Sequence, residues 1–159
     1  MLVLRNLGDE DVVLMKKWLE QEFISKWFGD ASDWLLEIEH RNDEFNFIKH
    51  FIVEKDGVPV GFCQYYDWNK AMDDDGEPEG TCGIDYMIGE ESLLGKGYGK
   101  NIVRLICDKV IENRPDTVQI IADPSVEEEK INIPSIKVLE ANEFQYDPKT
   151  ELYKKQLNV

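Results

Sequence analysis

Glycines at alternating positions mark the segment of this sequence whose residue types most directly suggest chemistry. The segment reads Gly95, Lys96, Gly97, Tyr98, Gly99 and Lys100. Alternating glycines allow a tight loop to direct several backbone N–H groups at one point. Residues 100–113 are predicted to form an amphipathic helix, and the positive N-terminal end of that helix adds to the same point. The segment therefore predicts a binding site for a diphosphate.

Two glycine motifs that bind nucleotides do not match this loop. A P-loop places Ser or Thr after its Lys to hold magnesium, whereas Asn101 follows Lys100 here. A Rossmann fingerprint opens a series of strands and helices near the start of a chain, whereas this loop lies past the middle. Glycine-rich turns before helices are also common as plain connections. Features elsewhere in the sequence are needed to distinguish a plain connection from a binding loop.

Histidines and cysteines offer little for catalysis in this chain. His40 and His50 are the two histidines, and neither lies near a cysteine in the sequence. A zinc site or a nucleophile activated by histidine is therefore disfavoured, and no metal is predicted. Cys63, Cys82 and Cys107 fall in separate apolar stretches, which predicts buried thiols rather than disulfides. Any catalysis must use carboxylates, tyrosines or backbone groups.

A mixture of strands and helices must position the loop and these side chains. The predicted strands cover residues 3–7, 45–54, 58–68, 82–88, 117–122, 144–146 and 152–157. A first helix is predicted to end near residue 19, and further helical segments cover 23–28, 32–41, 100–113 and 132–141. Asp56-Gly57 is a hairpin turn, and residues 69–80 form an exposed acidic loop. Most apolar residues between 23 and 41 are expected to pack in the core, with a few lining an acceptor cleft.

The order of these elements and four separate motifs resemble the GCN5-related N-acetyltransferases, and in particular the aminoglycoside 6′-N-acetyltransferases. The motifs are Gly61 to Tyr66 in the hairpin, Gly83-Ile84-Asp85 before the loop, Ser92 to Gly99 in it, and Asp123-Pro124-Ser125 after the next strand. The resemblance covers essentially the whole chain. It implies an α/β (α+β) fold in which helices flank a mixed central sheet. It also implies that acetyl-coenzyme A binds where the strands before the Gly95–Gly99 loop splay apart.

The resemblance also implies which residues hold the coenzyme. Residues 95–100 would bind the pyrophosphate, with positive charge from their lysines and from Arg104. Backbone groups of Met87 and Ile88 would pair with the pantetheine arm and polarise the acetyl carbonyl. Asn132 stands where the family has its Asn.

Two carboxylates are implied to serve the acceptor. An ammonium acceptor has to lose a proton before it attacks a thioester, and Asp85 is the candidate base or amine anchor. Asp123, at the end of the neighbouring parallel strand, would bind a second amine of a polycationic acceptor. Each also has a purely structural interpretation. Asp85 could be a buried residue whose carboxylate is hydrogen-bonded within the protein, and Asp123 could be part of an Asp-Pro-Ser turn. Tyr66 and Trp68 are candidates for stacking on the acceptor, although one face of their strand is expected to be core.

The last helix departs from the family pattern at two positions. Leu139 stands where a tyrosine is common, and Glu143 stands where a glycine is common. In many relatives that tyrosine protonates the leaving thiolate. The acid is therefore unassigned in this sequence, which does not rank Tyr98, Tyr146 and Tyr153 for the role.

Composition sets the remaining expectations. A chain of 159 residues that is 42% hydrophobic predicts one domain spanning residues 1–159. No signal-peptide core and no long apolar run is present, so a cytoplasmic protein without a membrane partner is expected. A net charge of -15 disfavours nucleic acid and suits a small cationic acceptor, although acidic surfaces also serve solubility. Both a monomer and a homodimer are compatible with the sequence.

The leading interpretation is an acetyl-coenzyme A-dependent N-acetyltransferase that acts on an aminoglycoside-like amine. One alternative keeps the fold and the chemistry but acetylates another amine, such as a polyamine, a peptide terminus or a siderophore precursor. A second alternative is a non-catalytic module that binds acetyl-coenzyme A as a sensor. A third is that the acidic surface binds a basic protein.

Overall fold

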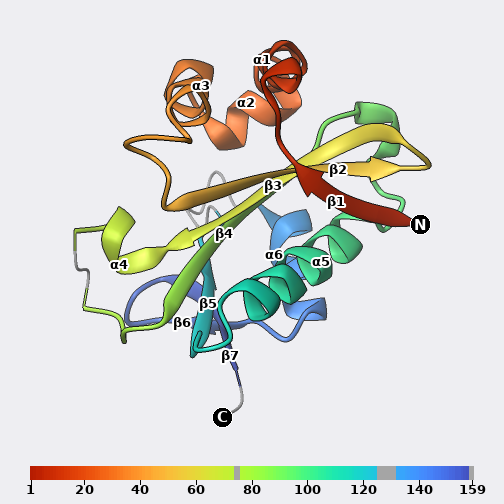
Figure 1. The fold of residues 1–159 in the computed structure, drawn as a ribbon. Helices are drawn as coiled ribbons and strands as arrows, with labels where there is room; N and C mark the ends of the chain where they lie inside the picture. Colours follow the sequence, from red (N-terminus) through yellow and green to blue (C-terminus); the bar gives the residue numbers. More distant parts are fainter. Residues whose placement is uncertain (74–75, 125–131, 158–159) are drawn as a thin grey trace.

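One mixed sheet organises the part of the chain that the structure describes. The structure is a computed structural model, and it describes residues 1–73, 76–124 and 132–157. The strands lie in the order β1-β2-β3-β4-β5-β7-β6, and neighbours are antiparallel except for β4 and β5 (Figure 1). The strands are β1 (Leu2–Asn6), β2 (Ile48–Lys55), β3 (Val58–Asp67), β4 (Thr81–Ile88), β5 (Gln119–Ala122), β6 (Gln145–Asp147) and β7 (Leu152–Gln156). The expected mixed central sheet is confirmed.

Helices cover both faces of this sheet. They are α1 (Val12–Leu19), α2 (Glu22–Phe28), α3 (Ala31–Glu39), α4 (Trp68–Ala71), α5 (Tyr98–Asn113) and α6 (Ile133–Ala141). Figure 1 shows α1, α2 and α3 on one face and α5 and α6 on the other. The helix after the glycine loop begins at Tyr98, earlier than predicted, because Gly97 adopts a left-handed conformation (φ 84°) and serves as its N-cap. Within the described ranges, no helix is both long enough and apolar enough to cross a membrane.

The hairpin of β2 and β3 turns where the sequence predicts, but β3 ends earlier than expected. Asp56 and Gly57 both have positive φ, at 50° and 81°, which suits a tight hairpin turn. At the far end, the carboxylate of Asp67 accepts a hydrogen bond from the backbone N–H of Lys70 at 3.1 Å and caps α4. The prediction that the strand continues through Trp68 is therefore wrong. Residues 74–75 of the acidic loop lie outside the described residues, as do Ser125 and residues 127–129.

The parallel pair in the middle of the sheet separates after three residues. β4 and β5 are in register over Thr81, Cys82 and Gly83 of β4, which face Gln119, Ile120 and Ile121. β5 ends at residue 122, whereas β4 continues to residue 88 and remains paired with β3 along its other edge. Among the residues that the structure describes, no strand pairs with the β5-side edge of β4 over residues 84–88. This opening is the splay that the resemblance implied.

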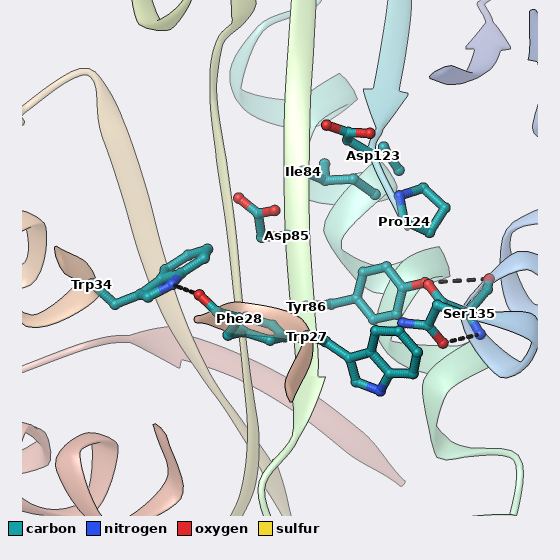
Figure 2. A pocket seen from close by; sticks show the side chains of 11 residues that line it. Trp27, Phe28, Trp34, Ile84, Asp85, Tyr86, Asp123, Pro124 and Ser135 are labelled. Atoms are coloured by element: carbon teal, nitrogen blue, oxygen red, sulfur yellow. Dashed lines mark hydrogen bonds between the residues drawn. The ribbon is translucent and has the colours of Figure 1, made fainter. Parts of the chain in front are cut away.

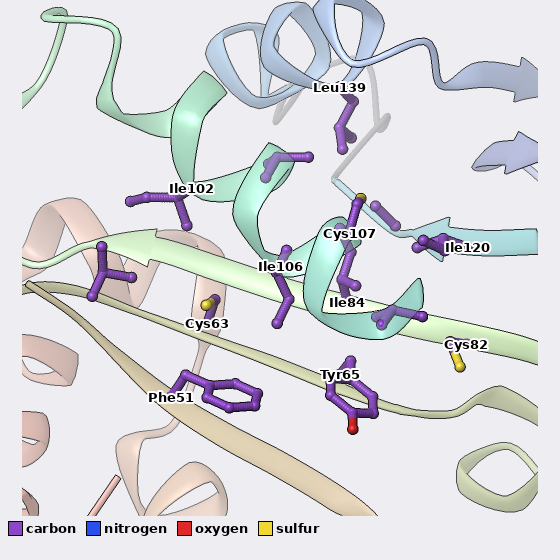
Figure 3. Packing of buried hydrophobic residues seen from close by; sticks show 14 of the residues in the cluster. Phe51, Cys63, Tyr65, Cys82, Ile84, Ile102, Ile106, Cys107, Ile120 and Leu139 are labelled. Atoms are coloured by element: carbon purple, nitrogen blue, oxygen red, sulfur yellow. The ribbon is translucent and has the colours of Figure 1, made fainter. Parts of the chain in front are cut away.

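The sheet face that α5 covers carries the larger apolar core, part of which is drawn in Figure 3. Ile102 and Ile106 of α5 are fully buried and pack in one cluster with Ile84 of β4 and Ile120 of β5. The cysteines Cys63, Cys82 and Cys107 are buried free thiols, as predicted. The core therefore fixes α5 against the strands whose separation forms the opening.

Candidate active site

The opening between β4 and β5 holds a small pocket with two carboxylates, which we call the carboxylate pocket (Figure 2). Its volume is about 100 Å³. It is lined by Trp27, Phe28, Trp34, Ile84, Asp85, Tyr86, Ala122, Asp123, Pro124, Asn132 and Ser135. Figure 2 shows Asp85 on one side of β4 and Ile84 and Tyr86 on the other, as the alternation of a strand requires. The structure thus brings together the two acids that the sequence singled out.

Asp85 lies in a setting that favours its protonated form. Burial, with a smaller contribution from the negative charge of Asp123, raises its pKa to about 6. The cross-strand neighbour Gln64 opposes this rise, because its Nε2 donates a hydrogen bond to Asp85 Oδ2 at 2.9 Å. A carboxylate with a pKa near 6 is largely ionised at neutral pH and can still accept and release a proton.

Asp123 faces the same pocket from the end of β5. The residue as a whole is solvent-exposed, but partial burial of its carboxyl raises the pKa of that group. The adjoining Pro124 is buried and also lines the pocket. Asp123 therefore combines access from solvent with a position beside Asp85, as an anchor for a second positive charge requires.

A second cavity, the side pocket, joins the carboxylate pocket through Asp85 and Trp34, which line both. Its volume is about 310 Å³. It is lined by Asp33, Trp34, Glu37, Ile48, Gln64, Tyr66, Ala71, Met72 and Asp85. The pKa of Glu37 is raised by burial and then by the charges of Asp85 and Asp33. Glu37 and Asp33 were missed by the sequence analysis, because acidic residues on a surface helix carry no signal of the pocket they face.

Tyr66 and Trp68 occupy different surroundings despite their stacked rings, whose centroids are 6.2 Å apart. Tyr66 is 8% exposed and lines the side pocket, and its ring lies against the backbone of Gly83. Trp68 is 3% exposed and packs in a core cluster with Ile121 and Leu152. The structure therefore places Tyr66 in the wall of the side pocket and packs Trp68 in the core beside it.

Aromatic residues of α2 and α3 form the wall opposite the carboxylates. Trp34 Nε1 donates a hydrogen bond to the carbonyl of Phe28 at 2.8 Å, and the two rings pack with centroids 4.9 Å apart. Trp27 lines the same pocket and is half-buried. These are the residues that leave the core to line a cleft, whereas Leu35 and Ile38 pack inward as expected.

An apolar groove of about 330 Å³ continues from the carboxylate pocket along the free edge of β4. It is lined by Phe23, Ile24, Lys26, Trp27, Phe28, Tyr86, Met87, Ile88, Leu94, Gly99, Asn132, Pro134, Ser135 and Val138. It therefore runs between α2 and α6 and ends at the glycine loop. Met87 and Ile88, whose backbone was predicted to hold a pantetheine arm, lie on the unpaired part of β4 that borders it.

The glycine loop is exposed and has the conformations that require glycine. Gly95 and Gly97 have positive φ, at 75° and 84°. Lys96 and Lys100 are exposed beside them, so the loop offers positive charge at the start of α5. Gly99 is buried, and a Cβ there would approach a methyl group of Val138 on α6 to 3.3 Å. This glycine thus allows α5 and α6 to meet at the end of the groove.

The remaining cofactor candidates are Tyr98, the first residue of α5, and Asn132, the N-cap of α6. Tyr98 is half-buried, and Lys55 Nζ lies 5.6 Å from the centre of its ring. Asn132 caps α6, since its side-chain oxygen accepts a hydrogen bond from the backbone N–H of Ser135 at 3.2 Å. Asn132 also lines both the groove and the carboxylate pocket. Its first role is to fix the helix start at the place where these cavities meet.

These features together define one continuous site. A long apolar arm with a diphosphate at one end fits the groove and the loop, and a cationic group fits the cavities with the carboxylates. Asp85 can accept a proton in the carboxylate pocket, which shares Tyr86, Asn132 and Ser135 with the groove. The arrangement suits transfer of a group from a long carrier to an amine.

Comparison with known families agrees with this description. The family described as acetyltransferase (GNAT) domain matches residues 8–152. The chain therefore belongs to the GNAT acetyltransferase domain family.

Particular relatives share a narrower description. Aminoglycoside N(6')-acetyltransferase type 1 of Klebsiella pneumoniae is 28% identical over 133 residues, and so is the protein of the same description from Serratia marcescens. Each match covers 78% of this chain but only 66% of the relative's own length. Aminoglycoside acetyltransferase AAC(6')-Ib in complex with coenzyme A and kanamycin has a TM-score of 0.80 at 23% identity, covering 98% of this chain and 95% of that one. An aminoglycoside N(6')acetyltransferase from Legionella pneumophila has a TM-score of 0.72 at 16% identity, covering 98% and 91%. The structural likenesses establish the fold.

Proposed function

We propose that this protein transfers the acetyl group of acetyl-coenzyme A to a primary amine of a polycationic acceptor of the aminoglycoside kind. The observation that carries the proposal is the meeting of the carboxylate pocket and the apolar groove at the free edge of β4. One cavity suits a cation, and the other suits a thioester arm. The named activities of the relatives at 28% identity support the same conclusion.

The coenzyme would lie in the groove with its pyrophosphate on the glycine loop. Backbone N–H groups of residues 95–100, the N-terminal end of α5 and the exposed Lys96 and Lys100 favour that anion. Backbone groups of Met87 and Ile88 would hold the pantetheine arm and polarise the acetyl carbonyl, since this part of β4 has no described strand partner on the edge that borders the groove. Acetyl-coenzyme A is the co-substrate, and the proposed reaction uses no metal. We place the reaction in the cytoplasm, where this coenzyme is available.

The acceptor would occupy the carboxylate pocket and the side pocket. Asp85 and Asp123 border the first, and Asp33 and Glu37 border the second. Several carboxylates around joined cavities suit an acceptor with several ammonium groups, because each gains a charge-assisted hydrogen bond. The aromatic wall of Trp27 and Trp34 suits the faces of sugar rings.

The reaction would follow direct attack. Asp85 takes a proton from the ammonium group, directly or through water, and the neutral amine attacks the thioester carbon. The carbon–sulfur bond breaks, and its electron pair stays on sulfur. The amine nitrogen becomes an amide, and the departing coenzyme gains one proton in total.

An acceptor panel tests the proposal. Thiol release from acetyl-coenzyme A would be followed with kanamycin, tobramycin, spermidine, a set of peptides and paromomycin, which has a hydroxyl where kanamycin has its 6′-amine. Rapid release with kanamycin and tobramycin, and slow release with paromomycin, is the expected result. Turnover confined to spermidine or peptides would move the acceptor to another class of amine. Coenzyme binding without release on any amine would contradict the enzyme and favour a sensor.

A further inference from the structure

Tyr86 lies on β4 between Asp85 and Met87 and lines both the carboxylate pocket and the apolar groove. All six tyrosines of the chain are within the described residues, and Tyr86 is the one that lines both cavities. Asp85 projects from the opposite side of the strand (Figure 2). A phenol therefore stands where the acceptor and the thioester arm would meet, facing away from the base.

The hydroxyl of Tyr86 is held by the first turn of α6. It forms a hydrogen bond with Ser135 Oγ, drawn as a dashed line in Figure 2. Ser135 itself is fixed by the Asn132 cap, because its backbone N–H donates to Asn132 Oδ1. Leu139, one helical turn further on, is fully buried and apolar. Leu139 thus offers no polar group here, whereas Ser135 holds the hydroxyl of Tyr86 at the start of the same helix.

We propose that the Tyr86 hydroxyl donates a hydrogen bond to the sulfur of the departing coenzyme A and that Ser135 orients it for this. The inference rests on the proposed function. When the carbon–sulfur bond breaks, the electron pair remains on sulfur, and Tyr86 stabilises that charge while it keeps its own proton. The proton that completes the thiol is the one released by the attacking nitrogen, delivered through solvent.

The hydrogen-bonding capacity of the pair agrees with this role. A hydroxyl donates one hydrogen bond and accepts two. The phenol oxygen also lies 3.4 Å from the backbone carbonyl oxygen of Ser135, to which it donates a long hydrogen bond. When Ser135 Oγ donates to the phenol oxygen, the phenol hydrogen can exchange this long hydrogen bond for one to sulfur. Burial raises the pKa of Tyr86 to about 12, against the opposing effect of the Ser135 hydrogen bond, so the phenol stays protonated in the neutral range.

The experiment measures the thiol pKa of bound coenzyme A from its thiolate absorbance, in the wild type and in Tyr86→Phe, Ser135→Ala and Tyr146→Phe. Tyr146, on β6, is 41% exposed and lines neither the carboxylate pocket nor the groove, so it provides the control for loss of a phenol hydroxyl. We expect Tyr86→Phe to raise the bound thiol pKa by about one unit, the size of one hydrogen bond to a charged group. Ser135→Ala should raise it by less, and Tyr146→Phe should leave it unchanged. Turnover with acetyl-coenzyme A should fall about tenfold in Tyr86→Phe with unchanged acceptor KM.

The outcomes separate this inference from the proposed function, because the titration needs no acceptor. A thiol pKa in Tyr86→Phe equal to that of the wild type, with equal coenzyme affinity, would overturn the role of Tyr86 whatever the acceptor is. A raised thiol pKa together with no turnover on any amine would support Tyr86 as a sulfur donor and contradict the acetyltransferase proposal. Failure of the wild type to bind coenzyme A would overturn both.

Discussion

Each ionised carboxylate of the site disfavours ionisation of its neighbours as long as no cation is bound between them. The pKa of Asp85 is raised by burial and by Asp123, and the pKa of Glu37 is raised by burial, Asp85 and Asp33. An acceptor with several ammonium groups relieves these like-charge contacts as it binds. The same residues therefore supply recognition and keep the pKa of the base close to neutrality.

The pH dependence of kcat/KM follows from this setting. Asp85 must be ionised to accept a proton, so activity should rise with pH through an apparent pKa of about 6. Asp123→Asn removes a like charge and should lower this apparent pKa, since ionised Asp85 is then less disfavoured. The measurement is kcat/KM against pH for both proteins, with an acceptor whose amines stay protonated throughout. An unchanged acidic limb in Asp123→Asn would contradict the coupling of the two carboxylates.

Glu37 tests whether the side pocket binds the acceptor. Glu37→Gln should raise the KM of acceptors with several amines about tenfold, since one charge-assisted hydrogen bond is lost. Coenzyme affinity should not change. Glu39→Gln on the same helix is the control, because Glu39 is exposed and lines neither pocket. Equal KM values in Glu37→Gln and Glu39→Gln would exclude the side pocket from acceptor binding.

Secondary structure was largely predictable from the sequence, because its signals are local. Short stretches of sequence are enough to predict the turn at Asp56-Gly57 and the glycine loop before α5. The separation of β4 from β5 cannot be predicted in this way, because it depends on where β5 ends relative to β4, two strands that are far apart in the sequence. The contact of Tyr86 with Ser135 likewise joins residues far apart in sequence. Asp85 and Asp123 could be identified as site residues through the family resemblance. Glu37 could be identified only once the structure had placed α3 over the sheet.

Gly83 shows how closely the strands fit around the site. A Cβ at this position would lie 2.5 Å from ring atoms of Tyr66. Gly83→Ala should therefore displace that ring, lower the free energy of unfolding by about 1–3 kcal/mol and raise the acceptor KM. Urea unfolding of Gly83→Ala, Tyr66→Leu and the double variant measures the effect as a cycle. Simple additivity of the two changes would show that the alanine does not press on Tyr66.

The charge of the whole molecule should affect the two substrates differently. The net charge is -15, and the proposed acceptor is cationic whereas the coenzyme is anionic. Added salt screens charges over about 10 Å at 0.1 M, so the acceptor KM should rise several-fold as salt increases, and the coenzyme KM should change less. Steady-state kinetics over a salt series checks this. A coenzyme KM that rises as steeply as the acceptor KM would contradict electrostatic attraction of the acceptor by the acidic molecule.

The central claim is that Asp85 accepts a proton from the acceptor amine, which then attacks acetyl-coenzyme A bound in the groove. The most direct measurement compares kcat/KM and coenzyme A affinity for the wild type, Asp85→Asn and Asp43→Asn, the last an exposed carboxylate. We predict that Asp85→Asn loses about 10²- to 10⁴-fold in kcat/KM while coenzyme A affinity stays within about twofold. Asp43→Asn should match the wild type. Near-normal turnover by Asp85→Asn with the preferred acceptor would contradict the account.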